Sequence, residues 1–259
     1  MPRILVTNDD GVRSEGLRAL ADALRPLGEV TVVAPIMEAS AIGHALTLRR
    51  PLRIETFDDR TFAVDGTPTD CVNIGVITIL KGLPDLVVSG INKGWNLGDD
   101  VTYSGTVAGA MEGSMLGAPS FAVSIKRTKI GMKTGLDFTH AAASAAVIAE
   151  QVLRAGLPPR TFLNVNLPEG RPKGFRLTTQ AKRNHVTSVA EKEDPRGQPY
   201  FWIEEGQNHW EPDARSDYQA VVDGFVSVTP LHSDLTNRGA LEVLGAIEEL
   251  SLGGEVKVR

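Results

Sequence analysis

The sequence contains few of the side chains that build the commonest redox and zinc sites. Its 259 residues include one cysteine, Cys71, and five histidines. A single cysteine cannot form an intrachain disulfide, which is typical of proteins from reducing compartments. No two histidines have the spacing of a zinc site. We therefore interpret Cys71 as a buried apolar residue and predict a cytoplasmic protein.

Long apolar runs are also missing. A membrane-spanning helix needs ~20 apolar residues. The most apolar helix candidate, residues 140–151, is rich in alanine and interrupted by Ser144. The first apolar run has three residues before Asp9 and Asp10, which is too short for a secretory signal peptide. We expect neither a membrane partner nor secretion.

The chain has no excess of positive charge. Its formal net charge is −5 and its sequence pI is about 5.6. Proteins that bind duplex nucleic acid usually carry a basic face, so we expect no DNA or RNA duplex partner. A small phosphate ester remains compatible with this charge, because it needs only local positive charge or a metal.

Three common motifs of nucleotide-binding proteins and hydrolases are absent as well. The first predicted strand is not followed by Gly-x-Gly-x-x-Gly, and the chain contains neither a Walker loop nor a Gly-x-Ser-x-Gly elbow. These absences argue against a dinucleotide-binding fold, a P-loop NTPase and a serine hydrolase of the elbow type.

The first 170 residues alternate between short apolar runs and segments with helical spacing. Continuous apolar strands are typical of a parallel sheet that is covered on both faces. The alternation therefore predicts a three-layer, doubly wound α/β fold with a mostly parallel sheet. The predicted strands are 4–7, 30–34, 86–89, 121–124 and 162–166, the predicted helices are 14–27, 106–116 and 139–155, and 48–64 is a predicted edge hairpin.

The pattern changes after residue 170, where a polar stretch precedes an aromatic segment. A turn signal at 194–197 lies between them, so we predict a long hairpin at about 176–205. A hairpin this long often projects from the body and meets another subunit; an ordinary edge hairpin is the alternative. A late strand is predicted at 225–229 and a C-terminal helix at 237–250.

These elements predict one domain over 1–259. It has an α/β catalytic core at 1–170. Its C-terminal part, 171–259, contains the hairpin, the late strand and the helix.

Polar residues follow the predicted strands. In an open parallel sheet, ligands bind beyond the carboxyl ends of the strands. Asp9 and Asp10 follow the first strand, and Ser40 and Asn92 lie in two later strand-end loops. A divalent cation would relieve the repulsion between the two carboxylates, and oxygen ligands favour Mg²⁺ or Mn²⁺ over zinc. The alternative is that one aspartate only caps the turn before the helix.

Residues 103–110 combine hydroxyl groups with the start of a helix. Ser104 and Thr106 flank Gly105 at the beginning of a segment of small residues. The free N–H groups and the positive end of such a helix form an anion site. The alternative is a capped helix that packs closely through its small residues. A hard-metal site and a phosphate cradle at one sheet edge would together indicate phosphate-ester chemistry.

These loops resemble the signatures of the SurE survival protein family, whose members are metal-dependent 5′-nucleotidases. The resemblance extends in order from residue 3 to about residue 236. The matching segments are VTNDDG at 6–11, EASAIGH at 38–44, DGTPTDCV at 65–72, SGINKGWNLG at 89–98, YSGTV at 103–107, DPRG at 194–197, GFVSVTPL at 224–231 and DLT at 234–236.

The resemblance implies a phosphatase that hydrolyses nucleoside 5′-monophosphates to nucleoside and phosphate. Related members also act on 3′-monophosphates, and some on short polyphosphate. One divalent metal ion per subunit is implied, with the ligands Asp9, Asp10, Ser40 and Asn92. Asp9, Asp10 and Asn92 are the implied catalytic residues.

The family's phosphate-binding loop corresponds to Asn96, Ser104, Gly105 and Thr106 of this chain. The resemblance also implies a homodimer or homotetramer with exchanged C-terminal segments, which fits the long predicted hairpin.

Two other functions remain open from the residues alone. One is a non-catalytic, Mg²⁺-dependent module that senses nucleotide or phosphate, because receiver domains also place an acidic pair after their first strand. Receiver domains need an acceptor aspartate at a later strand end, and residues 89–92 contain none. The other is a metal-dependent hydrolase of a different substrate. Trp95 is a candidate to stack on a base or to pack on the body, and His44 is the histidine expected nearest the site.

Overall fold

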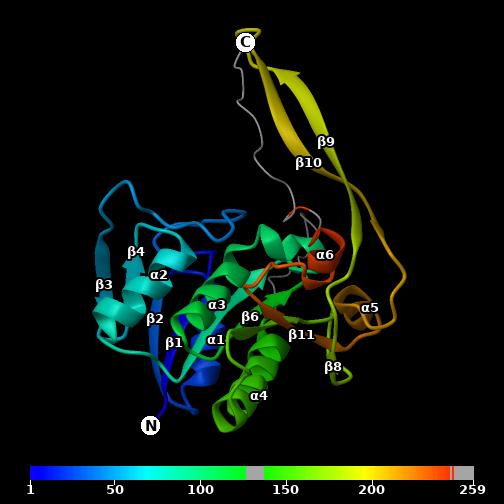
Figure 1. The fold of residues 1–259 in the computed structure, drawn as a ribbon. Coiled ribbons are helices and arrows are strands. Elements are labelled where there is room, and N and C mark those ends of the chain that lie inside the picture. The colour runs from blue at the N-terminus through cyan, green and yellow to red at the C-terminus, as the bar shows by residue number, and fades with distance from the viewer. Residues whose placement is uncertain (127–136, 246, 248–259) are drawn as a thin grey trace, which may run out of the picture.

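A computed structural model describes residues 1–126, 137–245 and 247, with the side chains of 183–187 and 204–208 left out. Its centre is a nine-stranded sheet in the order β3-β4-β2-β1-β5-β6-β7-β11-β8. The strands lie between two layers of helices, and a long hairpin extends away from them (Figure 1).

Five parallel strands form the middle of the sheet: β1 (Arg3–Thr7), β2 (Glu29–Pro35), β5 (Leu86–Lys93), β6 (Ser120–Ile125) and β7 (Thr161–Asn166). Nearly all their residues are buried, as the continuous apolar runs predict. The predicted doubly wound fold is confirmed.

The helices cover both faces of this sheet. On one face, α1 (Glu15–Leu24) and α4 (Thr139–Ala155) share a core with Ile4 and Val6 of β1. On the other face, α2 (Pro68–Ile74) packs on Leu5, which lies between Ile4 and Val6 in β1. Alternate side chains of a strand point to opposite faces, which makes three layers.

On the same face as α2 lies α3 (Gly105–Leu116), which packs on β5, β6 and β7. A π-helical turn, Gly75–Ile79, extends α2, and a 3₁₀ helix, Gly98–Thr102, precedes α3. Cys71 of α2 is buried, as predicted, and burial raises the pKa of its thiol well above its ordinary value. Within the described ranges, no helix is long and apolar enough to cross a membrane.

Both sheet edges depart from the parallel pattern. At one edge, β3 (Ile54–Asp58) and β4 (Thr61–Val64) form the predicted antiparallel hairpin. At the other, β11 (Val226–His232) pairs antiparallel with β7 and parallel with the short β8 (Phe175–Leu177). Strands from both sides of residue 170 therefore share one sheet.

The predicted long hairpin is present, with shifted bounds. It consists of β9 (Arg183–Glu193) and β10 (Pro199–Trp210), which project from the body in Figure 1. A short helix, α5 (Asp217–Val222), follows it. The C-terminal helix α6 covers Arg238–Val243; residues 246 and 248–250 of the predicted helix lie outside the described residues.

Candidate active site

The first feature of the site is a buried carboxylate at the end of β1. Asp9 is 4% exposed and Asp10 is half-buried. The Asp9 carboxylate accepts a hydrogen bond from the hydroxyl of Thr106, at the start of α3. A Cβ on Gly105 would lie 2.9 Å from the Asp9 Cβ, so the missing side chain lets the helix end approach the carboxylate. The strand end and the helix start therefore meet as predicted.

Burial has a direct electrostatic consequence for this carboxylate. The pKa of Asp9 is raised from 3.8 to about 6. Burial is the largest cause, the hydrogen bond from Thr106 opposes it, and the neighbouring charge of Asp10 adds to it. The site thus holds two close acidic groups that a cation would stabilise.

The loop after β2 also reaches this point. The Ala39 N–H donates to the carbonyl of Asp9 at 2.8 Å, and the Gly43 N–H donates to the carbonyl of Tyr103 at 3.0 Å. These bonds bring the loop of Ser40 to the acidic pair. Ser40 itself is exposed, and its hydroxyl donates to Glu38 at 2.6 Å. Its role as a metal ligand stays a prediction.

Asn92 lies in β5, beyond a break in the pairing of β5 with β6. The register shifts between Ser89 and Asn92, and such bulges redirect side chains near functional sites. The Asn92 amide nitrogen donates to the carbonyl of Gly94 at 2.9 Å. Its amide oxygen is therefore the atom of this side chain that suits a cation.

The start of α3 is a capped helix end that also contacts Asp9. The Ser104 side chain caps the helix by accepting from the N–H of Val107 at 3.1 Å. Thr106 is fully buried, and its hydroxyl donates to Asp9. Gly105, between them, supports a close approach of the helix backbone. Phosphate binding by these residues stays a prediction, since the structure shows capping and a contact to Asp9.

Asn96 is held by residues that sequence reasoning missed. Its N–H donates to the side chain of Asn166 at 2.8 Å, and its carbonyl accepts from Asn164 at 2.8 Å and from Asn166 at 3.0 Å. Its own amide donates to Ser124 at 2.7 Å. Asn164 and Asn166 alternate along β7, so both point to the same face, which was a signal available in the sequence.

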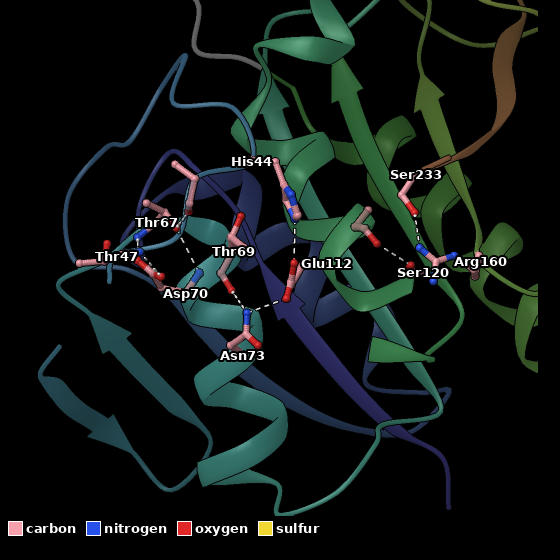
Figure 2. Close-up of polar contacts among 12 residues, drawn as sticks. His44, Thr47, Thr67, Thr69, Asp70, Asn73, Glu112, Ser120, Arg160 and Ser233 are labelled. Atoms are coloured by element: carbon pink, nitrogen blue, oxygen red, sulfur yellow. Dashed lines mark hydrogen bonds and ion pairs between the residues drawn. The ribbon is translucent and has the colours of Figure 1, made fainter. Parts of the chain in front are cut away.

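A second polar cluster fixes His44 beside α3. The His44 ring lies 2.7 Å from the carboxylate of Glu112, whose other oxygen accepts from Asn73 at 2.7 Å. Asn73 also donates to the carbonyl of Thr69 (Figure 2). Glu112 is 6% exposed, so a buried acid ties α2, α3 and the loop of His44 together. Sequence reasoning named His44 but not its partners.

We expect Glu112→Ala to destabilise the protein by about 1–3 kcal/mol, because it removes the buried carboxylate that accepts from Asn73 and pairs with the His44 ring. Urea denaturation measures the free energy of unfolding. Glu112→Gln is the matched control, because it keeps an oxygen for Asn73, and it should lose much less. Equal stability of Glu112→Ala and the wild type would contradict the expectation that Glu112 stabilises the contact between α2, α3 and the loop of His44.

Trp95 packs on the body of the protein. Its indole N–H donates to the carbonyl of Leu167, and the Lys126 ammonium lies 5.3 Å from its ring centre. Of the two interpretations drawn from the sequence, packing is the one that these contacts describe.

The donor atoms fit a hard divalent cation. In the part of the chain that the structure describes, no group of three His, Cys, Asp or Glu side chains could hold a metal. The candidates are instead two carboxylates, a hydroxyl and an amide oxygen, which suit Mg²⁺ or Mn²⁺ and not zinc. The buried charge of Asp9 beside Asp10 supplies the electrostatic reason for a cation there.

Comparison with known proteins decides the family. The family described as Survival protein SurE matches residues 4–187. The chain belongs to the SurE family. It is 52% identical over 241 residues to "5′-nucleotidase SurE" of Syntrophotalea carbinolica, covering 93% of this chain and 95% of that protein. The protein of the same name from Geobacter sulfurreducens is 51% identical over 244 residues, covering 93% and 92%.

A solved SurE structure has the same architecture. The SurE protein from Aquifex aeolicus superposes with a TM-score of 0.83 and 45% identity, over 95% of this chain and 100% of that one. Membership of the SurE family also implies a requirement for a divalent metal ion.

Proposed function

We propose that this SurE chain hydrolyses nucleoside 5′-monophosphates to nucleoside and phosphate. The observation that carries the proposal is the meeting of Asp9 with the start of α3. There, the buried carboxylate of Asp9, next to the half-buried Asp10, lies against a helix end that has no side chain at Gly105. A metal-binding acid pair and an anion-binding helix end, side by side, suit a phosphate ester. Relatives of this chain carry the name 5′-nucleotidase.

In this proposal Asp9, Asp10, Ser40 and Asn92 hold one divalent ion, Mg²⁺ or Mn²⁺. When bound, such an ion polarises a phosphoryl oxygen and lowers the pKa of a coordinated water. The all-oxygen donor set supports the choice of ion. The hydrogen bond from Thr106 orients the Asp9 carboxylate, and Asn92 is oriented by its bond to Gly94.

The remaining residues of the proposed site bind and orient the phosphate. The N–H groups at the start of α3 and the hydroxyl of Ser104 would stabilise negative charge on the phosphoryl oxygens as the ester bond breaks. Asn96, fixed by β7, would orient the phosphate from the opposite loop. Gly105 lets the helix end lie directly against Asp9.

The proposal is tested by phosphate release from a panel of 5′- and 3′-nucleoside monophosphates and short polyphosphate. We expect turnover with Mg²⁺ or Mn²⁺, highest on 5′-monophosphates, and no turnover in excess chelator. Undiminished activity in chelator would overturn the metal assignment. Tight nucleotide binding without turnover in any metal would favour a sensing module, and turnover only of sugar phosphates or acetylated substrates would favour another hydrolase.

Assembly and location are two further parts of the proposal. We propose a homodimer or homotetramer in which C-terminal segments are exchanged, with the hairpin contacting a second copy of the chain. Large apolar side chains on the hairpin are exposed, which is typical of an interaction surface: Val189, Tyr200, Phe201, Trp202 and Ile203. Sedimentation of the intact chain distinguishes monomer, dimer and tetramer. We also propose a cytoplasmic location, which the single reduced cysteine supports.

A further inference from the structure

A second buried carboxylate, outside the acidic pair, contacts the loop that carries Asn96. Asp217 lies in the first turn of α5 and is fully buried. One of its oxygens accepts from the N–H of Gly98 at 3.0 Å. The other accepts from the N–H of Ala181 at 3.0 Å and from that of Tyr218 at 2.7 Å. One side chain therefore joins three backbone segments.

Gly98 is enclosed by the chain around the base of the hairpin. Its carbonyl accepts from the side chain of Gln180 at 3.0 Å, so both of its backbone polar groups bind residues far along the sequence. A Cβ on Gly98 would lie 2.4 Å from the carbonyl oxygen of Ala181 and 3.1 Å from the ring of Trp210. Its φ of +53° also favours glycine. No side chain separates this loop from the hairpin base.

Trp210, the last residue of the hairpin, is itself anchored to α5. Its ring stacks on Tyr218 with centroids 4.4 Å apart, and Tyr218 is the residue next to Asp217. The hairpin base, α5 and Gly98 thus form one packed unit in which the carboxylate supplies the polar contacts.

Asn96 lies two residues before Gly98 and is fixed from the other side. Its N–H and carbonyl both bond to β7 side chains. We call residues 95–98 the phosphate loop; the name does not include residues 104–106 at the start of α3. The loop is therefore held at Asn96 by the sheet and at Gly98 by Asp217. Losing one of these two anchors lets the loop backbone shift about the other, and with it the Asn96 side chain, whose amide donates to Ser124 at 2.7 Å.

We propose that Asp217 is a positioning residue for the phosphate loop, which it joins to the base of the hairpin. This inference rests on the proposed function, because it takes Asn96 as a phosphate contact. Asp217 does not reach the phosphate; it fixes the backbone that presents Asn96. A carboxylate is needed because it accepts on both oxygens, whereas the amide of an asparagine would place an N–H group against one of the N–H donors.

The test compares Asp217→Asn with Asp223→Asn in the intact chain. Asp223 caps the other end of α5, where its carboxylate accepts from Arg176 at 2.6 Å and Gln219 at 2.8 Å. Three quantities are measured for each variant: KM for a nucleoside monophosphate, the inhibition constant of inorganic phosphate, and the rise of Tm that inorganic phosphate produces. Metal affinity is measured separately by calorimetry.

We expect Asp217→Asn to raise KM and the inhibition constant of phosphate about tenfold. This factor corresponds to the loss of one hydrogen bond to a charged group. The phosphate-induced rise of Tm should shrink, while metal affinity stays within twofold. Asp223→Asn should lower Tm without changing either constant. A lower Tm of Asp217→Asn with unchanged KM and inhibition constant would overturn the inference. That result is the one expected of a carboxylate that only stabilises the fold.

Two more variants keep the result decisive. If Asp217→Asn does not fold, Gln180→Ala removes only the bond to the Gly98 carbonyl, and it should raise the inhibition constant about threefold; an unchanged constant overturns the inference. Asn96→Ala separates the inference from the function on which it rests. If that variant binds phosphate as the wild type does, the assignment of Asn96 is wrong and the inference is overturned with it.

Discussion

Asp9→Asn is expected to abolish hydrolysis while leaving the metal-free protein at least as stable as the wild type. The side chain is buried, it lies next to Asp10, and its pKa is raised to about 6 chiefly by burial. At pH 7 the ionised carboxylate therefore opposes folding by roughly 1–3 kcal/mol. Asparagine has nearly the same shape without the charge, and its oxygen can still accept from Thr106. Function and stability are thus opposed at this position.

The loss of activity should be on the order of 10³-fold or more in kcat/KM, as is typical when a residue that acts with others in one catalytic unit is removed. Thermal denaturation in chelator measures the stability, and the same measurement with Mn²⁺ tests metal binding. We expect the metal-induced rise of Tm to vanish in the variant. Asp22→Asn, at an exposed carboxylate of α1, is the control for simple removal of negative charge.

Two results would contradict this prediction. Activity within tenfold of the wild type would mean that Asp9 is not part of the catalytic unit. A Tm that falls by several degrees in chelator would mean that its carboxylate stabilises the fold, so that the acidic pair would be structural and not a cation site.

The order of elements in the core could be predicted because its sequence signals are local. The central strands contain short apolar runs, and α4 has the predicted bounds, 139–155. Two helices, α2 and α5, were not predicted, because they have seven and six residues and too few turns for a clear period. Their capping signals were present. Thr67 and Asp70 form a capping box at the start of α2, which Figure 2 shows, and Ser216 caps α5.

The strand-end rule could place parts of the site but not its supports. Asp9 was recognisable because two acids directly follow a buried strand, and the structure brings it to the start of α3. The partners of the supporting groups are remote in sequence: Glu112 contacts His44 across 68 residues, and Asp217 contacts Gly98 across 119. No local pattern encodes such a distance. These carboxylates become visible only when the fold has brought the segments together.

The hairpin shows how a local signal can give an element without its bounds. The turn at 194–197 was evident, and Asp194 closes it by accepting from the N–H groups of Arg196 and Gln198. The strands run further from this turn on the second side than predicted, to Trp210. Packing on Tyr218 at the base, which depends on a later helix, anchors that end.

Gly105→Ala is expected to lower kcat/KM about 100-fold, because the added methyl group would fall between the two halves of the site. Its Cβ would lie 2.9 Å from the Asp9 Cβ, 3.1 Å from an Asp9 carboxylate oxygen and 3.3 Å from the carbonyl of Ala39. The first distance is shorter than a Cβ atom normally tolerates and the other two are tight, so α3 and the acidic pair must move apart. A displacement of ~1 Å between catalytic groups can reduce a rate by 10²-fold. The pKa of Asp9 and the bond from Thr106 would change with it.

Gly109→Ala is the matched control for this change, one turn later on the same helix. Its added Cβ would lie 2.9 Å from the side chains of Ser89 and Thr7, so it introduces a comparable clash with the sheet but not with Asp9. Both variants should lose stability by ~1–3 kcal/mol from overpacking, offset in part by the higher helix propensity of alanine. Phosphate release and urea denaturation separate the two effects. If both variants lose activity equally, displacement of the whole helix controls the site. A selective loss in Gly105→Ala means that the contact between the helix end and Asp9 does so.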